Sequence, residues 1–170
     1  TLKNKLTLKT GAIVTNAVAG DTQTANGTAT GNTVKAEDGT ATNAVGGKTL
    51  AGKASGNKAE AAGGNVTNLK GAQSASGLVQ ENHARITAGT IGTAVGAESA
   101  NGAATENDVT VMGGTVTTAT GGESTHGEAS GNTAVISGGT VTNVYGGKAG
   151  TLSKGNKIFL KDSATASVSE

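Results

Sequence analysis

Apolar and polar residues alternate in short runs along this chain, and the runs recur at a constant interval. Each run follows an asparagine. These asparagines stand 25 residues apart at Asn32, Asn57, Asn82, Asn107 and Asn132, and the last step, to Asn156, is 24 residues. The residues from Asn4 up to Asn32 fit a first coil of 28 residues with small insertions. A single period over a whole chain is typical of proteins built from stacked repeats.

The run after each asparagine has a period of two, which is the period of a β-strand whose side chains point alternately to opposite faces. We predict that the second and fourth positions after the asparagine face inward and that the positions between them face solvent. The inward columns contain Val34, Ala59, Ala84, Val109, Ala134 and Ile158, and then Ala36, Ala61, Ile86, Val111, Ile136 and Leu160. On one outward column Lys35, Glu60 and Arg85 predict a ladder of alternating charge.

Glycine columns divide each repeat into three segments. The column Gly39, Gly64, Gly89, Gly114 and Gly139 ends the first strand, where a corner needs a residue that tolerates positive φ. A second strand carries the inward columns Ala41, Val66, Ile91, Val116 and Val141, and Ala44, Leu69, Ala94, Ala119 and Val144. We predict a further corner at Gly46, Gly71, Gly96, Gly121 and Gly146, and a third, weaker strand around Ala54, Val79, Ala104 and Ala129.

These segments predict an all-β fold: a single-stranded parallel β-helix, or β-solenoid, of about six coils with three faces per coil and about 4.8 Å between coils. We interpret residues 1–170 as one solenoid segment of a longer repeat protein. Its coils begin near Asn4, Asn32, Asn57, Asn82, Asn107, Asn132 and Asn156. The asparagine amides are expected to bond to their equivalents above and below or to corner backbone. The handedness and the oligomeric state stay open.

Composition supports a narrow coil. Glycine supplies 29 of the 170 residues, cysteine, proline and tryptophan are absent, and the only aromatic residues are Tyr145 and Phe159, both on outward columns. The formal net charge of +1 provides no electrostatic footprint for nucleic acid. No apolar run is long enough for this segment to insert directly into a membrane.

The glycine-rich phrase AVISGGTVTNVYGGKAG at residues 134–150, echoed by VTVMGGTVTTATGGES at 109–124 and LTLKTGAIVTNAVAGD at 6–21, resembles the repeats in passenger domains of bacterial autotransporter adhesins. The resemblance covers nearly the whole chain. It implies an exported, extracellular β-helical stalk on the bacterial cell surface, with a signal peptide before it and a membrane anchor after it. It also implies adhesion to a host or bacterial surface protein or glycan. Segments such as GAESANGAATEN are similar to the head repeats of trimeric autotransporters.

A second hypothesis rests on threonines that flank the inward column of the second strand. They form the pattern T-x-T in three of five coils, and the candidate ligand or ice face consists of Thr40, Thr42, Thr67, Thr90, Thr115, Thr117, Thr140 and Thr142. The arrangement is similar to that in β-helical ice-binding proteins. A structural interpretation is also open, because threonine is a good outward strand residue. Asn65, Gly92 and the variable column Val45, Lys70, Val95, Thr120 and Tyr145 are expected to disturb the flatness of this face.

The repeat does not bring a recognisable set of catalytic residues into one column. His83 and His126 fall in different columns, and without cysteine neither a thiolate zinc site nor a cysteine-histidine pair is available. The sequence predicts no enzyme, no catalytic residue, no cofactor and no metal site; a polysaccharide-active solenoid enzyme is the third possibility. Together with the resemblance, which implies the extracellular location, this leads us to expect an extracellular structural or adhesive fibre module. We also expect it to associate end to end, because Leu6, Leu8, Ile158 and Leu160 place apolar positions in its outermost coils.

Overall fold

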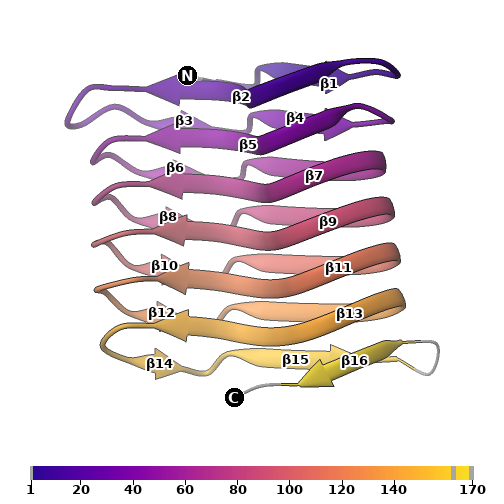
Figure 1. The fold of residues 1–170 in the computed structure, drawn as a ribbon. Helices are drawn as coiled ribbons and strands as arrows, with labels where there is room; N and C mark the ends of the chain where they lie inside the picture. The colour runs from indigo at the N-terminus through magenta and orange to yellow at the C-terminus, as the bar shows by residue number, and fades with distance from the viewer. Residues whose placement is uncertain (1, 162–163, 169–170) are drawn as a thin grey trace.

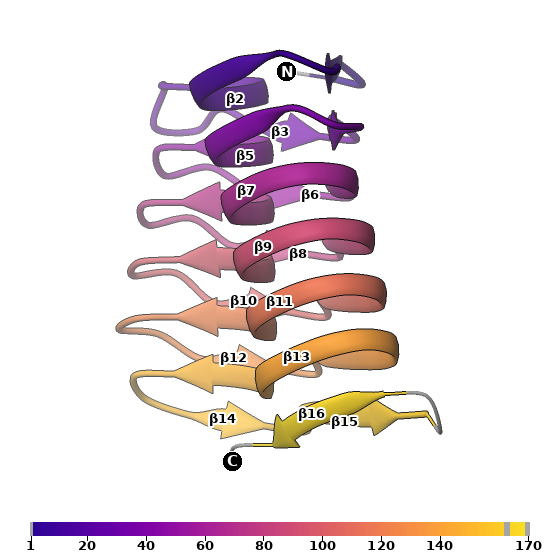
Figure 2. The same ribbon diagram turned by 45° about the vertical axis from the view of Figure 1, so that its right-hand side comes forward.

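The chain folds into a stack of β-coils (Figure 1). The computed structural model describes residues 2–161 and 164–168, and every regular element in that part of the chain is a β-strand. All strand pairs are parallel, and a turned view shows the coils stacked along one axis (Figure 2). The prediction of an all-β parallel solenoid of about six coils is confirmed.

The first two coils contain separate strands, whereas the next four each begin with one long strand. The early strands are β1 (Lys5–Leu8), β2 (Ile13–Thr22), β3 (Ala29–Thr30), β4 (Thr33–Ala36), β5 (Thr40–Thr49) and β6 (Ala54–Ser55). The long strands, each followed by a two-residue strand, are β7 (Lys58–Ser74), β8 (Val79–Gln80), β9 (His83–Ser99), β10 (Ala104–Thr105), β11 (Asp108–Ser124), β12 (Ala129–Ser130), β13 (Thr133–Ala149) and β14 (Ser153–Lys154). The stack ends with β15 (Lys157–Leu160) and β16 (Thr165–Val168).

Coil-to-coil register follows the repeat. The long strands pair Lys58 with His83 and His83 with Asp108, so residues 25 apart are stacked neighbours. The insertions in the first coil widen the offset there, because Lys5 pairs with Thr33 and Ile13 pairs with Thr40. The third strands, as weak as predicted, form a separate six-stranded sheet in the order β14-β12-β10-β8-β6-β3.

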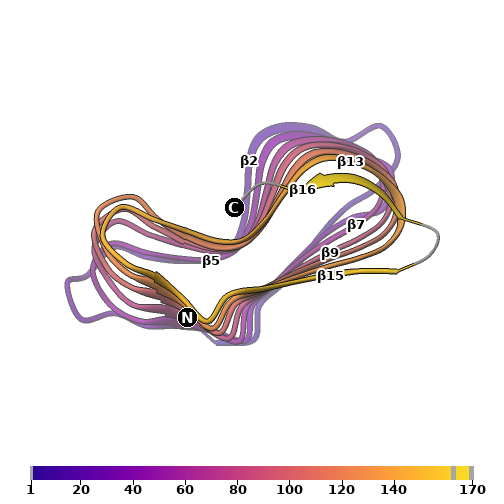
Figure 3. The same cartoon turned by 90° about the horizontal axis from the view of Figure 1, so that it is seen from below.

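Each coil has a waist, which the repeat pattern did not predict. Seen along the stack, the outline shows a wide lobe and a narrower one joined where the two sides approach (Figure 3). The large lobe is filled by the predicted inward columns, such as Ile86, Ile91 and Val116, which are almost completely buried. The small lobe is filled by Ala29, Ala54, Ala72, Val79, Ala97 and Ala104. We call the approach between the two lobes the neck.

The two predicted glycine corners have different physical causes. Gly64, Gly89, Gly114 and Gly139 have φ between 75° and 100°, which confirms a corner at these positions. Gly39, the first member of the predicted column, does not have a positive φ. At the second predicted corner, the outline bends without a positive φ at any of Gly46, Gly71, Gly96, Gly121 and Gly146. These residues are buried within continuous strands at the neck. A methyl carbon on Gly96 would lie 2.1 Å from the Gly121 carbonyl oxygen and 2.6 Å from the Asp108 carbonyl oxygen, so glycine is required by close backbone approach.

The asparagine column beside the neck forms the predicted amide ladder. Asn82 donates to the Asn107 Oδ1 atom from both its backbone N–H and its Nδ2, each at 3.0 Å, and Asn107 donates to Asn132 in the same way. The Asn107 Nδ2 also donates to the Val79 carbonyl at 3.1 Å. Because these side chains are buried, the hydrogen bonds satisfy amides that would otherwise carry a desolvation penalty.

A second hydrogen-bonded column closes the far end of the small lobe, and our sequence interpretation missed it. The Ser99 hydroxyl accepts from the Gly102 N–H and donates to the Gly77 carbonyl of the preceding coil, both at 2.9 Å. Ser124 repeats the arrangement with Gly127 and Gly102. The available sequence signal was a Thr or Ser three residues before each glycine of the turn, at Thr49, Ser74, Ser99 and Ser124. All four are buried.

Candidate ligand-binding face

The predicted threonines line two neighbouring columns on the outside of the large lobe. Strands β5, β7, β9, β11 and β13 contribute one residue to each column, on either side of the buried column Ala41, Val66, Ile91, Val116 and Val141. All eight candidates are exposed, namely Thr40, Thr42, Thr67, Thr90, Thr115, Thr117, Thr140 and Thr142. We call this surface the threonine face. Its strand spacing of about 4.8 Å and its two-residue step of about 7 Å set the hydroxyl lattice.

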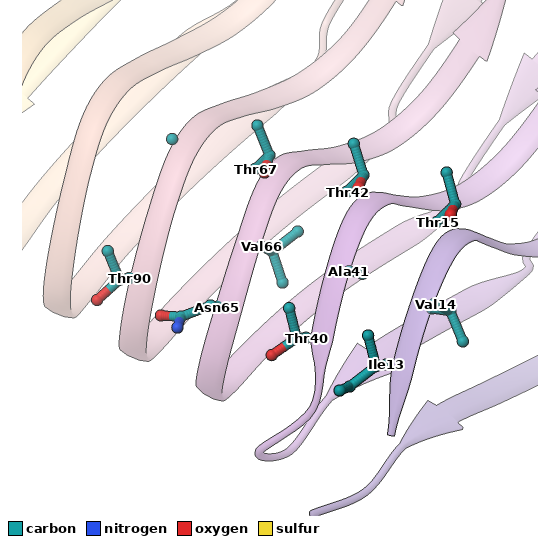
Figure 4. Close-up of a pocket in the computed structure, with 11 residues that line it drawn as sticks. Ile13, Val14, Thr15, Thr40, Ala41, Thr42, Asn65, Val66, Thr67 and Thr90 are labelled. Carbon is teal, nitrogen blue, oxygen red and sulfur yellow. The ribbon is translucent and has the colours of Figure 1, made fainter. Parts of the chain in front are cut away.

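The structure extends the threonine face at both ends of the stack. Thr15 precedes Thr42 in one column, and Thr165 follows Thr140 in the other. Figure 4 shows Thr15, Thr42 and Thr67 in one row beside Thr40 and Thr90 in the other, while Val14 and Val66 point to the opposite side of the strands. The space between the rows is a shallow trough of about 360 Å³.

The threonine face is interrupted at three places. Ile13, which is 82% exposed, occupies a threonine position in the first coil, and Asn65 and Gly92 occupy two more in the centre. The large lobe also bows outward along β13 (Figure 3), so the face is curved across the strands. The unbroken part is therefore the group Thr115, Thr117, Thr140 and Thr142.

The variable column beside the threonine face does not project into solvent as expected. Val45, Val95 and Thr120 are buried, and Lys70 and Tyr145 are half-buried. These residues directly precede the neck glycines, where the outline of the coil turns inward (Figure 3). The interpretation that the whole column disturbs the flatness of the threonine face was therefore wrong for the buried residues Val45, Val95 and Thr120.

Charged side chains gather instead on the outer face of the strand that follows each asparagine. Lys58, Glu60, His83, Arg85 and Asp108 line a hollow of about 250 Å³ over three coils. His83 pairs with Asp108 on the next coil, and this hydrogen bond to the carboxylate raises the pKa of His83 above its ordinary value, against the opposing effect of burial.

The predicted charge ladder of Lys35, Glu60 and Arg85 has the predicted strand register, but its residues do not form the predicted ion pairs. Glu60 is the strand neighbour of both Lys35 and Arg85. Lys35 nevertheless pairs with Glu37 on its own coil at 3.0 Å, and this contact lowers the pKa of the exposed Glu37. Arg85 donates to the Met112 sulfur at 3.2 Å. Within the described residues the other ion pairs between coils are Lys70–Glu98 and Lys148–Glu123.

No group of three or more His, Cys, Asp or Glu residues that could hold a metal ion occurs in the described part of the chain. Across residues 2–161 and 164–168 there is also no helix suited to crossing a membrane. Tyr145 carries the one aromatic contact found there, with the Lys148 ammonium 5.3 Å from its ring centre.

Comparison of the chain with models of protein families, with curated proteins and with solved structures found no match.

Proposed function

We propose that this chain is a structural and adhesive β-solenoid module, part of a stalk or fibre on the outside of a bacterial cell. The observation that carries the proposal is the continuous strand pairing from β1 to β15, reinforced by the buried asparagine ladder. A stack with one repeated interface is a stiff spacer, since each coil contacts only its neighbours through the same hydrogen bonds. The resemblance of its glycine-rich repeats to autotransporter passengers supports an extracellular location.

The role is non-enzymatic, and the contacts are of two kinds. Proteins or glycans of a host or bacterial surface would bind along the sides of the stack. The threonine face offers them hydroxyl donors and acceptors with methyl groups between, a combination suited to an extended polar chain. Other copies of this chain would associate with it end to end.

Adhesion is tested with beads that carry the chain, presented to an array of neutral and acidic oligosaccharides and to purified surface proteins. We expect retention on at least one of these surfaces, and loss of it in the double variant Thr117→Lys, Thr142→Lys. The matched control is Ser76→Lys, Thr125→Lys, which changes two exposed residues at the far turn of the small lobe. Equal retention of both variants would remove the threonine face from the proposal, and no retention of the parent would remove adhesion.

Ice binding is the second candidate, and the exposed group Thr115, Thr117, Thr140 and Thr142 favours it. Regularly spaced hydroxyl and methyl groups can order water at a surface. Thermal hysteresis of the parent, abolished in the Thr117→Lys, Thr142→Lys variant, is the expected result for this candidate. A freezing point equal to that of a control protein at the same concentration excludes it.

A further inference from the structure

The only arginine of the sequence, Arg85, lies in the charged hollow on the outer side of the stack. The hollow extends over the strands β7, β9 and β11, on the part of each strand that follows the asparagine column. The first of its two columns carries threonine in the adjoining coils, at Thr33 and Thr133. The hollow is therefore bounded by neutral residues in this column, and its charged side chains form a cluster inside the stack.

The guanidinium of Arg85 is poorly satisfied within the protein. A guanidinium has five N–H donors, and the one side-chain hydrogen bond that Arg85 makes to a described residue runs from Nη2 to the Met112 sulfur at 3.2 Å. A thioether sulfur is a weak acceptor. Glu60 is the strand neighbour of Arg85, yet the two form no ion pair among the described residues. Most N–H donors of Arg85 are therefore available to an acceptor from outside the protein.

The two carboxylates of the hollow differ in their partners. Asp108 is paired with His83, whereas Glu60, which is half-buried, belongs to no ion pair in the described part of the chain. A carboxylate only accepts hydrogen bonds, so Glu60 suits a hydroxyl donor, while Arg85 and Lys58 suit an anion. Neighbouring strands lie about 4.8 Å apart, which places a cation and an acceptor within reach of one small ligand. A sulfate group has no donor for Glu60 and would be repelled by it.

We propose that the charged hollow binds a carboxylated sugar residue of an acidic glycan. This inference rests on the adhesive role in the proposed function, and it names a ligand class and a second site for that role. The Arg85 guanidinium donates two parallel N–H bonds to the sugar carboxylate, and hydroxyl groups of the same sugar donate to the Glu60 carboxylate. The hollow, of about 250 Å³, is smaller than the pockets of about 300 to 1,000 Å³ that enclose drug-sized ligands, so it suits one sugar unit of a chain.

The test is isothermal titration calorimetry of the 170-residue chain with a short oligogalacturonate and with sialyllactose, at ligand concentrations into the millimolar range. We expect at least one of the two to bind, and the pair distinguishes a hexuronate from a sialate. The methyl ester of the bound sugar keeps the hydroxyl groups but lacks the charge, and it should bind at least about tenfold more weakly. A peptide of glutamates with the same net charge is the remaining probe. Binding of this peptide as tight as that of the sugar would overturn the assignment to a glycan.

Two substitutions at Arg85 separate the paired hydrogen bonds from simple charge attraction. Arg85 is exposed, so its substitution leaves the packed lobes intact. Arg85→Gln should weaken binding of the acidic sugar at least about tenfold, because a charge-assisted contact is lost. Arg85→Lys keeps the charge without the planar fork and should recover only part of the affinity. The matched control is Lys53→Gln, which removes one positive charge at an exposed site just before β6 and should leave the dissociation constant nearly unchanged.

The outcomes of these titrations are distinct from those of the adhesion test. If Arg85→Gln binds the acidic sugar as tightly as Lys53→Gln does, the sugar does not occupy the charged hollow and the inference is overturned. If the parent binds neither oligogalacturonate nor sialyllactose, the inference is also overturned. The threonine face of the proposed function is then still judged separately, by retention of the Thr117→Lys, Thr142→Lys variant.

Discussion

The large lobe and the neck achieve close packing in opposite ways. In the large lobe, branched side chains such as Ile86, Ile91 and Val116 fill the space between two strands, and the strands stand a side chain apart. At the neck the strands meet backbone to backbone, and glycines leave no side chain between them. The large lobe is stabilised by burial of apolar area. The neck is stabilised by close contact between backbones and by the hydrogen bonds of the amide ladder beside it. A change of one carbon atom should therefore have unequal effects in the two regions.

The largest effect is expected from Gly96→Ala at the neck. The new methyl carbon would lie 2.1 Å from the Gly121 carbonyl oxygen, and only a backbone shift can relieve that contact. We expect the free energy of unfolding to fall by about 3 kcal/mol or more. Urea denaturation followed by circular dichroism measures the change.

Two single-carbon controls make this comparison decisive. Ile86→Val removes one carbon from the large lobe and should cost about 1 kcal/mol. Gly56→Ala adds one carbon at a turn where, its two chain neighbours aside, no atom of the described residues lies within 4 Å of that carbon. It therefore tests only the strain of its positive φ, worth about 1 to 2 kcal/mol. If Gly96→Ala costs no more than these two, the neck is not the tight contact described above.

The next effect concerns the amide ladder. Asn107→Ala removes the acceptor for two donors of Asn82 and the donor to the Val79 carbonyl, all in a buried site. We expect a loss of about 2 to 3 kcal/mol in the free energy of unfolding, because the remaining polar groups stay buried without partners. Asn101→Ala, at an exposed asparagine, should change it by less than about 0.5 kcal/mol. Equal losses in the two variants would show that burial of the ladder is not what makes it stabilising.

The sequence was sufficient to predict the large lobe because two-residue alternation over five coils identifies which side of a strand is buried. It could not predict the neck. Glycine serves both at corners with positive φ, as at Gly114, and at close backbone contacts, as at Gly121, and the two uses look the same in a sequence. Alternation also indicates only the side on which a residue lies. The alternation places Val95 on the outward side, yet it is buried beside the neck.

The candidate face was predictable to the same extent. The eight threonines are exposed, as the alternation indicated, but the outward curvature of the large lobe depends on the corner and the neck together. Their function is a matter for the adhesion and freezing measurements. The hydroxyl column of Ser99 and Ser124 was missed because serine in a glycine-rich segment has the appearance of an ordinary turn residue.

A gain of stability is expected at the edge of the neck. Thr120 is fully buried, and its hydroxyl oxygen has no hydrogen-bond partner among the residues that the structure describes. Thr120→Val keeps the shape of the side chain and should raise the free energy of unfolding by about 1 kcal/mol, since valine already occupies this column at Val45 and Val95. Thr118→Val, at a half-buried position on the same strand, is the control and should be nearly neutral. A loss of stability in Thr120→Val would mean that the hydroxyl has a partner in solution.

The smallest effect separates the charged outer surface from both packed regions. His83 has a raised pKa in the folded chain because it donates to Asp108, while Lys58 opposes its charge and Glu81 favours it. A group whose folded pKa is raised contributes stability that is fully present below its unfolded pKa, about 6.5, and is lost as pH rises through the folded value. The free energy of unfolding of the parent relative to His83→Gln should therefore decline from pH 6 upward, by less than about 1 kcal/mol because the pair is partly exposed. Asp108→Asn should remove the same pH dependence. If the difference in free energy of unfolding between the parent and His83→Gln stays constant or grows as pH rises, the pair does not form. Gly96→Ala and Asn107→Ala are the controls, because packing and amides do not titrate. Each should lower the free energy of unfolding by the same amount at every pH in this range.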